Sequence, residues 1–517
     1  MKLRHVFSEM PYAVALFASH LDSRCSFCAA DASDESGSKH QCEMGCQLVV
    51  YCSESCHDND RPFHENECKA TLQGKSTDGS TIADLEARLM GRIIARYSLD
   101  RGIASLSFDF PNHMFKDRHF DDLLTHEREL RRSVSHEHLY KLTEKSFYKF
   151  FQDTDLGSTP KSMLRKFFYR LAINGFSLNL RLQPSPDGIK ELGEVIYLNV
   201  SRFNHSCRPS CLYRFDGSRI VIEYVDHNDS DDASPMQFSK EEFENLTLQY
   251  GFGSHHSYGT SCPMKDQRIK SLKPRYFFEC RCVLCSDKRL DQIQHDAAPV
   301  ECSECKVPYV WKRAVLIGSM KLKKMCNCRE SKSSSSGSSK SLILYAFGKN
   351  SQKNVRELSK KWKKTMRMAY NKRPSIGIKW CKSILDMAEA YWHPVYNVRL
   401  GQLNEKIFTG MRKLLVKNGT AFVGTADELN LMLRSGETML NVYTTYFEPY
   451  MITIATYAAD LASLYKLRGR LPEDEERRQH WHCFAVKVWM ERGEEKFARA
   501  IQEQAEDPPL TWCPTNA

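Results

Sequence analysis

The spacing of the cysteines constrains this chain more than any other feature of its sequence. Four close pairs of soft metal ligands follow one another within 44 residues, with two or three residues between the members of each pair. The pairs are Cys25 and Cys28, Cys42 and Cys46, Cys52 and Cys56, and His64 and Cys68. A pair this close lets one turn of the chain present two ligands to a single tetrahedral ion, and four pairs suit two Zn²⁺ ions. A disulfide framework would require an oxidising compartment and would not explain the histidine.

We therefore predict a zinc finger at 25–68, which needs its ions to fold because so short a segment has little core. Its sequence resembles a MYND finger, on the residues at 50–56 (Val-Tyr-Cys-Ser-Glu-Ser-Cys) and at 64–68 (His-Glu-Asn-Glu-Cys). In MYND fingers the ligand pairs interleave. The resemblance implies that one ion is bound by Cys25, Cys28, Cys52 and Cys56, and the other by Cys42, Cys46, His64 and Cys68.

Three further segments resemble, in order, parts of SET methyltransferases. Residues 197–209 contain the Asn-His-Ser-Cys motif, residues 245–251 resemble the strand that ends in the active-site tyrosine, and residues 275–285 resemble the post-SET segment. Together with the finger, they resemble the SET and MYND domain-containing (SMYD) protein-lysine methyltransferases. The resemblance implies methyl transfer from S-adenosyl-L-methionine to a lysine of a histone or non-histone protein. Such a site must deprotonate a lysine, whose pKa is ordinarily about 10.4, and align it with the methyl group.

The resemblance also implies roles for individual residues. Tyr250 would be the active-site tyrosine, and Tyr276 and Phe176 would line the lysine channel. The cofactor-binding residues would be Asn174, Ser201, Asn204, His205 and Phe278, with Phe278 stacked on the adenine. A third zinc ion, bound by Cys207, Cys280, Cys282 and Cys285, would hold the post-SET segment on the SET core. Asn174 precedes a glycine, so an ordinary helix cap is an alternative interpretation of that residue.

The chain departs from the family at its beginning. Members of the family begin with a glycine-rich segment that contributes to the cofactor site, whereas the 24 residues before Cys25 contain no glycine. Ser210 also stands where the family usually has asparagine. An alternative hypothesis is therefore a catalytically weak or inactive adaptor, in which the MYND finger binds proline-containing peptides.

A fourth group, Cys302, Cys305, Cys326 and Cys328, consists of two close pairs and resembles a small zinc ribbon; reduced surface cysteines are the alternative. Assigning 15 of the 20 cysteines to zinc leaves an odd remainder without close pairing. This favours a reducing compartment, and we predict a protein of the cytoplasm and nucleus.

The positive charge of the chain is concentrated in one stretch. The formal net charge is +10, yet residues 306–373 contain 19 Lys and Arg and only two acidic residues, Glu330 and Glu357. This stretch could contact nucleic acid, or it could be a solvated linker and helix face. No apolar run is long enough to cross a bilayer, so we predict no membrane contact, and we expect a monomer.

The predicted fold class is α+β: a β-rich SET core split by the MYND finger and a helical insert, followed by a Cys-rich post-SET segment and an α-helical, tetratricopeptide-like domain. The predicted boundaries are a remnant of the N-terminal SET segment (1–24), the finger (25–68), a helical linker and insert (69–180), the SET core (181–275), the post-SET segment with the ribbon (276–330), a Ser-rich linker (331–341) and the C-terminal helical domain (342–517).

Overall fold

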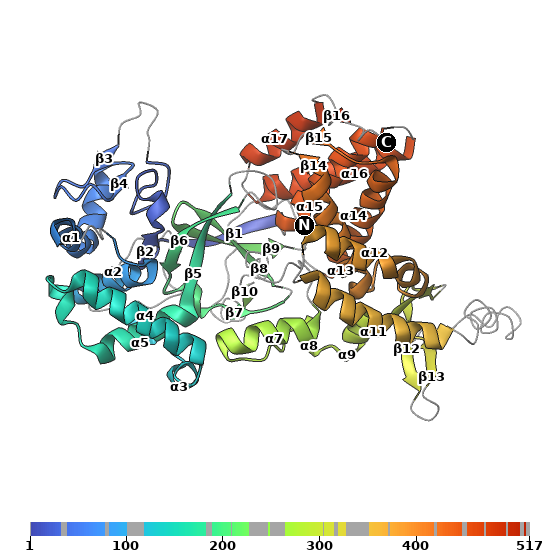
Figure 1. The fold of residues 1–517 in the computed structure, drawn as a ribbon, viewed down its shortest axis with the longest axis horizontal. Helices are drawn as coiled ribbons and strands as arrows, with labels where there is room; N and C mark the ends of the chain where they lie inside the picture. The colour runs from blue at the N-terminus through green and yellow to red at the C-terminus, as the bar shows by residue number, and fades with distance from the viewer. Residues whose placement is uncertain are drawn as a thin grey trace, which may run out of the picture. The chain divides into compact units, whose positions relative to one another are not determined.

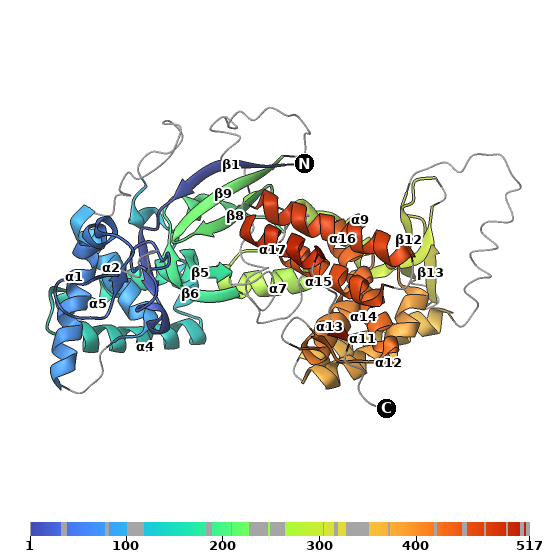
Figure 2. The ribbon, with the colours of Figure 1, turned by 90° about the horizontal axis from the view of Figure 1, so that it is seen from above.

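The computed structural model of the chain is shown in Figures 1 and 2. The structure describes residues 2–32, 39–77, 82–100, 118–181, 189–207, 209–226, 247–248, 264–302, 304–314, 319–326, 351–370, 373–417, 421–446, 452–469, 472–492, 495–506 and 511–512. The chain forms two compact units. The first unit contains 1–183, 187–249 and 272–279, and the second contains 184–186, 250–271 and 280–517.

The first unit is built on two sheets. The larger sheet has the strand order β1-β9-β8-β10-β7 and the smaller has the order β2-β6-β5. Their strands are β1 (Lys2–Glu9), β2 (Ala13–Leu16), β5 (Gly175–Arg181), β6 (Ile189–Ile196), β7 (Asn204–His205), β8 (Cys211–Asp216), β9 (Arg219–Asp226) and β10 (Thr247–Leu248). β8 and β9 form an antiparallel hairpin, and Gly217 adopts a left-handed φ of 58° in its turn, where glycine carries no steric penalty. β1 pairs along β9 from Lys2 to Glu9, so the first strand of the chain is part of this sheet.

Helices pack beside the smaller sheet and form an aromatic core. They are α2 (Leu85–Asp100), α3 (Glu127–Leu130), α4 (Val134–Phe151) and α5 (Lys161–Asn174), with the short 3-10 helices η1 (Ala18–His20), η2 (Phe120–Asp122), η3 (Asp155–Ser158) and η5 (Val200–Arg202). Gly91 allows α2 to approach α4 closely, because a Cβ there would lie 2.5 Å from the ring of Phe151. The helical segment is predicted to run to residue 180, but its last helix, α5, ends at Asn174, and β5 begins at Gly175. The reason is the strict alternation of apolar and polar residues from Phe176 onward, which is the period of a strand.

The finger consists of β3 (His40–Gln41), β4 (Val50–Tyr51) and α1 (Glu54–Thr77). β3 and β4 pair as a short antiparallel ladder, and Cys25 forms an isolated bridge with Val50. With so few strand residues, the described part of the segment has little regular structure of its own beyond α1. This agrees with a fold that depends on metal and on contacts with α2.

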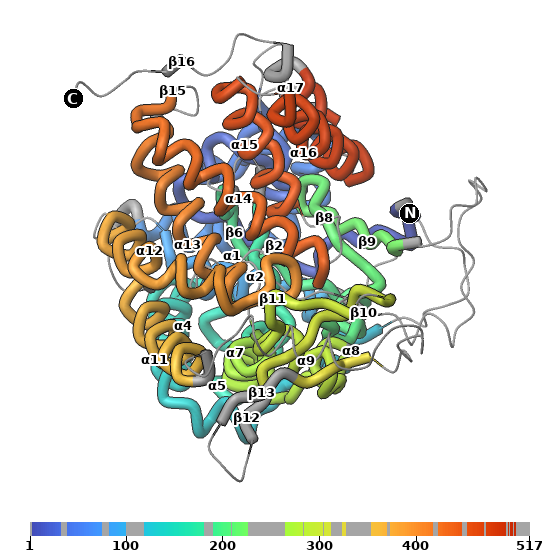
Figure 3. The backbone as a smooth tube through the Cα atoms, turned by 90° about the vertical axis from the view of Figure 1, so that its right-hand side faces the viewer, coloured from blue at the N-terminus to red at the C-terminus, as the bar shows by residue number. Residues whose placement is uncertain are grey.

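The second unit contains two small sheets, with strand orders β11-β12-β13 and β14-β15-β16, together with short helices and a series of longer helices, which Figure 3 shows from the side. Its elements are α7 (Lys265–Tyr276, whose last residues belong to the first unit), α8 (Val283–Ser286), α9 (Lys288–Asp296), β11 (Ala297–Glu301), β12 (Pro308–Ala314), β13 (Ser319–Lys323), α11 (Ser351–Tyr370), α12 (Pro374–Tyr391), α13 (Val398–Leu415), β14 (Val416–Lys417), β15 (Ala421–Phe422), α14 (Ala426–Tyr446), α15 (Ile452–Arg468), α16 (Pro472–Glu491), α17 (Glu495–Glu506) and β16 (Thr511–Trp512). From α11 to α17 each helix packs on the next, as in helical repeats. In the described part of the chain, no helix has both the length and the apolar character needed to cross a membrane.

Candidate functional site: zinc groups and a methyl-transfer segment

Two groups of ligand atoms lie close together in the finger. The sulfurs of Cys25, Cys28, Cys52 and Cys56 lie within 4.8 Å of one another, and so do the ligand atoms of Cys42, Cys46, His64 and Cys68. Pairs from distant parts of the finger therefore come together, and each group could hold one Zn²⁺ in a tetrahedral set. Nε2 of His64 faces the sulfurs, at 3.3 Å from Sγ of Cys46.

The other ring nitrogen of His64 contacts a buried carboxylate. Nδ1 lies 3.1 Å from Oε2 of Glu67, which is 1% exposed. A carboxylate in this position accepts the Nδ1 proton, so that Nε2 keeps its lone pair for the metal. Burial alone would raise the pKa of Glu67, but Arg92 and Arg88 hold it well below its usual range, so Glu67 stays ionised.

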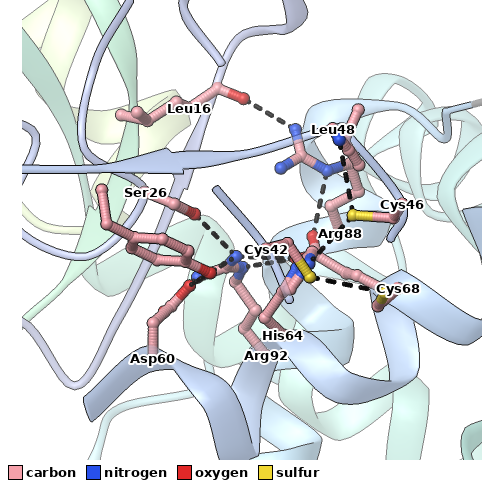
Figure 4. A network of polar contacts seen from close by, with 12 residues as sticks. Leu16, Ser26, Cys42, Cys46, Leu48, Asp60, His64, Cys68, Arg88 and Arg92 are labelled. Atoms are coloured by element: carbon pink, nitrogen blue, oxygen red, sulfur yellow. Dashed lines mark hydrogen bonds and ion pairs between the residues drawn. The ribbon is translucent and has the colours of Figure 1, made fainter. Parts of the chain in front are cut away.

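Two arginines of α2 connect this carboxylate to the rest of the first unit. Arg92 donates to Glu67 at 2.7 Å and to Asp60 at 2.8 Å, and both carboxylates lie on α1 of the finger. Arg88 donates to Glu67 at 3.0 Å and to the backbone oxygen of Leu16 at 2.8 Å (Figure 4). Leu16 is the last residue of β2, so Arg88 joins the second zinc group of the finger to a strand of the smaller sheet.

The segment that carries the Asn-His-Ser-Cys motif is held by Glu9, at the end of β1. Oε1 of Glu9 accepts the backbone N–H groups of Leu198 and Asn199 at 3.0 Å, and Oε2 accepts that of Val200 at 2.9 Å. Burial raises the pKa of Glu9 to about 7, while the three N–H donors act in the opposite direction. Glu9 thus satisfies three backbone donors that no strand or helix pairs, immediately before Ser201.

Two predicted cofactor residues, Asn204 and His205, form β7. This strand pairs in parallel with β10, with Thr247 opposite Asn204 and Leu248 opposite His205. The predicted catalytic residue Tyr250 follows β10 by two residues and lies outside the described residues. The strand that leads to Tyr250 therefore runs beside the motif that is predicted to hold the cofactor.

One predicted aromatic residue of the site, Phe278, contacts β7 at His205. The ring of Phe278 lies 5.8 Å from that of His205 and 6.5 Å from that of Tyr276, between centroids. Burial raises the pKa of Tyr276, so its hydroxyl stays protonated. Phe176 is 6% exposed in β5 and meets the ring of Tyr197 edge-on at 5.5 Å. Its exposure is that of a core residue, and its place in a lysine channel stays a prediction.

Local hydrogen bonds already use the side-chain donors of two other predicted cofactor-binding residues, Asn174 and Ser201. The Nδ2 amide of Asn174 donates to the backbone oxygens of Leu124 at 2.9 Å and Arg170 at 2.7 Å, which uses both of its hydrogens. The hydroxyl of Ser201 donates to the backbone oxygen of Tyr197. Each residue could therefore take part in cofactor binding only as an acceptor.

The third predicted zinc group is divided between the units. In the second unit the sulfurs of Cys280, Cys282 and Cys285 lie within 4.8 Å of one another. Arg268 of α7 donates to Cys285 at 3.5 Å, and a cationic donor of this kind favours the thiolate form. Cys207 belongs to the first unit, where its sulfur lies 3.3 Å from Nε2 of His205, and its part in the group stays a prediction.

In the fourth group, three of the four predicted ligands lie close together. The sulfurs of Cys302, Cys305 and Cys326 lie within 4.8 Å of one another beside the β11-β12-β13 sheet, and Cys328 lies outside the described residues. Lys306 adopts a left-handed φ of 57°, and its N–H donates to the carbonyl of Cys302, which closes a tight turn around the pair. The backbone N–H groups of Cys305 and Glu304 lower the pKa of Cys302 to about 7, which favours the thiolate that a metal requires.

Zinc content tests this fourth group. We expect four zinc ions per purified chain by elemental mass spectrometry, and three for Cys305→Ser, because an exposed ligand is lost from one group only. The matched control is Cys483→Ser, which removes an exposed cysteine of α16 that belongs to none of the four groups and should keep four ions. Three ions in both the unmodified chain and Cys305→Ser would contradict a zinc ribbon.

Curated relatives confirm the resemblance to the SMYD family. Human "Histone-lysine N-methyltransferase SMYD1" is 25% identical over 292 residues, which cover 56% of this chain and 52% of that protein. Mouse "Histone-lysine N-methyltransferase SMYD3" is 26% identical over 257 residues, 48% of this chain and 50% of that protein. "SET domain and MYND-type zinc finger protein 6" of Schizosaccharomyces pombe is 25% identical over 277 residues, 53% of this chain and 45% of that protein.

These relatives and the cysteine groups support a SET-MYND architecture with several groups that could hold zinc. The chain spans about half the length of the curated relatives it matches. No protein-family model matches the sequence.

Sequence reasoning missed the residues that hold the site together. Glu9 is not among the predicted site residues, although a carboxylate among buried apolar neighbours is a signal for a polar role. Glu67, Arg88 and Arg92 were not singled out, because charged residues in helices are usually solvated. The signal that could have found Arg88 and Arg92 is that each is a charged residue on the buried face of a helix.

Proposed function

We propose that this chain is an S-adenosyl-L-methionine-dependent protein-lysine N-methyltransferase that acts on lysines of histone or non-histone proteins. The observation that carries the proposal is the pairing of β7, with Asn204 and His205, beside the strand that leads to Tyr250. Phe278 and Tyr276 lie next to this pair of strands. The names of the relatives, which include histone-lysine and N-lysine methyltransferases, support the same activity.

The residues present fit such a cofactor. Asn204 is exposed and His205 half-buried, so polar atoms are available beside the aromatic face of Phe278, and adenine needs both a stacking surface and a polar partner. When bound, S-adenosyl-L-methionine supplies a methyl group on a positive sulfur. The chain would orient the lysine amine toward it, and the half-buried rings of Tyr276 and Phe278 would exclude water and favour the neutral amine.

In this proposal the zinc ions are structural: two in the finger, one at Cys207, Cys280, Cys282 and Cys285, and one in the ribbon. Each ion would be held by four protein ligands, with Cys328 as the fourth ligand of the ribbon, which would leave no open position for chemistry. We further propose that the protein acts as a monomer in the cytoplasm and nucleus, where thiols stay reduced.

A second candidate role, binding of proline-containing peptides by the finger, is favoured by a cavity of about 220 Å³ beside the second zinc group. Met44, Tyr51 and His57 line it together with the zinc ligands Cys42 and His64 and the charged residues Glu43 and Arg61. Met44 is 38% exposed, and this apolar edge beside the metal position would suit an apolar residue of an extended peptide. An adaptor would need only this site, whereas an enzyme needs the cofactor site as well.

Calorimetric titration with S-adenosyl-L-methionine tests the proposed enzyme. We expect saturable binding to the zinc-loaded chain, weakened about tenfold in Glu9→Gln. The amide would oppose one or more of the backbone N–H groups that Glu9 now accepts, and would loosen the segment that continues into Ser201, Asn204 and His205.

The matched control is Glu191→Gln, an exposed carboxyl on β6 of the same unit, which should bind as tightly as the unmodified chain. No binding by the folded, zinc-loaded chain would overturn the enzyme and leave the adaptor. Equal affinity in Glu9→Gln and Glu191→Gln would show that Glu9 does not position the cofactor segment.

A further inference from the structure

A cavity of about 570 Å³ in the second unit is lined by none of the predicted zinc ligands and is not used by the proposed function. α7, α9, α11 and α13 each contribute side chains to it. Its apolar surface comes from Trp362 and Met366 of α11, which are 6% and 4% exposed, and from Met264. Most of its other lining side chains are cationic, so positive charges lie beside this apolar surface.

Arg399 of α13 is the most buried cation of this cavity, with a side chain that is 12% exposed. Its guanidinium lies over Trp362, at 5.4 Å from the ring centroid, and near Trp392, at 5.8 Å. Its hydrogen bonds are long, at 3.5 Å to both Asp296 and Ser359. Within the described part of the chain, neither Nε of Arg399 nor Nε1 of Trp362 has a hydrogen-bond acceptor. Two buried N–H donors thus lack the partners that buried polar groups normally have.

The rim of the cavity carries charge that the protein does not neutralise. Lys270 lies 3.9 Å from Asp266, and Arg399 lies 3.5 Å from Asp296, so these two cations are balanced. Lys363 and Arg367, one turn apart on α11, are exposed and have no ion-pair partner among the described residues. Two positive charges therefore remain beside the two buried donors.

We propose that this cavity binds a phosphate group. A phosphate monoester carries a charge of about −1.5 to −2 at neutral pH and has three strong acceptor oxygens, which match the two excess cations and the unpartnered N–H groups. A guanidinium that lies over a buried tryptophan ring is restricted in its position, which favours binding of such an oxyanion. In this proposal the basic helix α11 forms the rim of the binding site. The ligand would be a small phosphate compound or the terminal phosphate of a nucleic acid.

Titration of the full, zinc-loaded chain with inorganic pyrophosphate tests the site. We expect saturable binding that is weakened at least about tenfold when Lys363→Gln and Arg367→Gln are combined, because two charge-assisted contacts are lost. The matched control combines Lys360→Gln and Lys364→Gln. It removes the same charge from exposed positions of the same helix that do not line the cavity, and should weaken binding less than about twofold. The readout does not depend on methyl transfer.

Competition distinguishes the two sources of phosphate. A single-stranded oligonucleotide with a terminal phosphate should displace pyrophosphate, and its unphosphorylated form should not, if nucleic-acid ends are the ligand. If neither oligonucleotide displaces pyrophosphate but a small phosphomonoester still binds, the site is assigned to free phosphate compounds. The proposal is overturned if folded protein does not bind pyrophosphate, if both double variants weaken binding equally, or if citrate, a carboxylate polyanion, binds more tightly than pyrophosphate.

Discussion

Replacing Glu67 by alanine is expected to lower the free energy of unfolding of the first unit by about 3–5 kcal/mol. The substitution leaves Arg88 buried without its carboxylate and Arg92 with Asp60 alone, and a buried charge without its partner is among the most destabilising changes in a protein. It also removes the acceptor of Nδ1 of His64, so this zinc ligand loses its preferred orientation. Both effects weaken the same junction between the finger and α2.

Two measurements check this expectation. Thermal unfolding of the zinc-loaded chain should show a lower midpoint, and a chromogenic chelator should remove one zinc ion faster than from the unmodified chain. The matched control is Glu65→Ala, which removes a carboxyl from the same helix where Glu65 pairs with Lys69 at the surface. Exposed pairs contribute about 0–1 kcal/mol, so the control should change little. Similar midpoints and similar zinc release for the two variants would contradict the proposed role of Glu67.

Replacing Tyr250 by phenylalanine is expected to lower methyl transfer by on the order of 100-fold or more. By the resemblance, its hydroxyl lies near the transferred methyl, and losing one positioned polar group in a site that excludes water costs about this much. Affinity for S-adenosyl-L-methionine should stay nearly unchanged, since the residues proposed to hold the cofactor lie on β7 and at Phe278. A loss confined to turnover is the signature of an interaction made in the transition state.

Turnover is measured as transfer of labelled methyl groups to mixed histones and to a protein extract, beside calorimetric binding of the cofactor. Tyr148→Phe is the matched control, because the hydroxyl of Tyr148 on α4 donates to the backbone oxygen of Thr159 and not to a residue of β7. Retained turnover in Tyr250→Phe, with Tyr148→Phe equally active, would remove Tyr250 from the proposed mechanism.

Metal-binding sites and segment order could be predicted from the sequence because the information is local. Ligands two or three residues apart are brought together by a single turn, whatever surrounds them, so Cys25 with Cys28 and Cys302 with Cys305 could be recognised directly. The interleaving of distant pairs came from the resemblance, not from spacing. The start of the strand at Gly175 could also have been predicted, because the alternation of apolar and polar residues from Phe176 onward is a local pattern.

The sequence by itself determined which residues could hold zinc and which motifs point to methyl transfer. Only the tertiary structure decided what supports them: Glu9 accepts three N–H groups from residues about 190 positions later, and Arg88 and Arg92 join α2 to the finger and to β2. It also placed Arg399 of α13 beside Lys363 and Arg367 of α11 around one cavity. The physical reason is that burial and partnership, which set the energy of a charged group, depend on contacts between segments far apart in the chain.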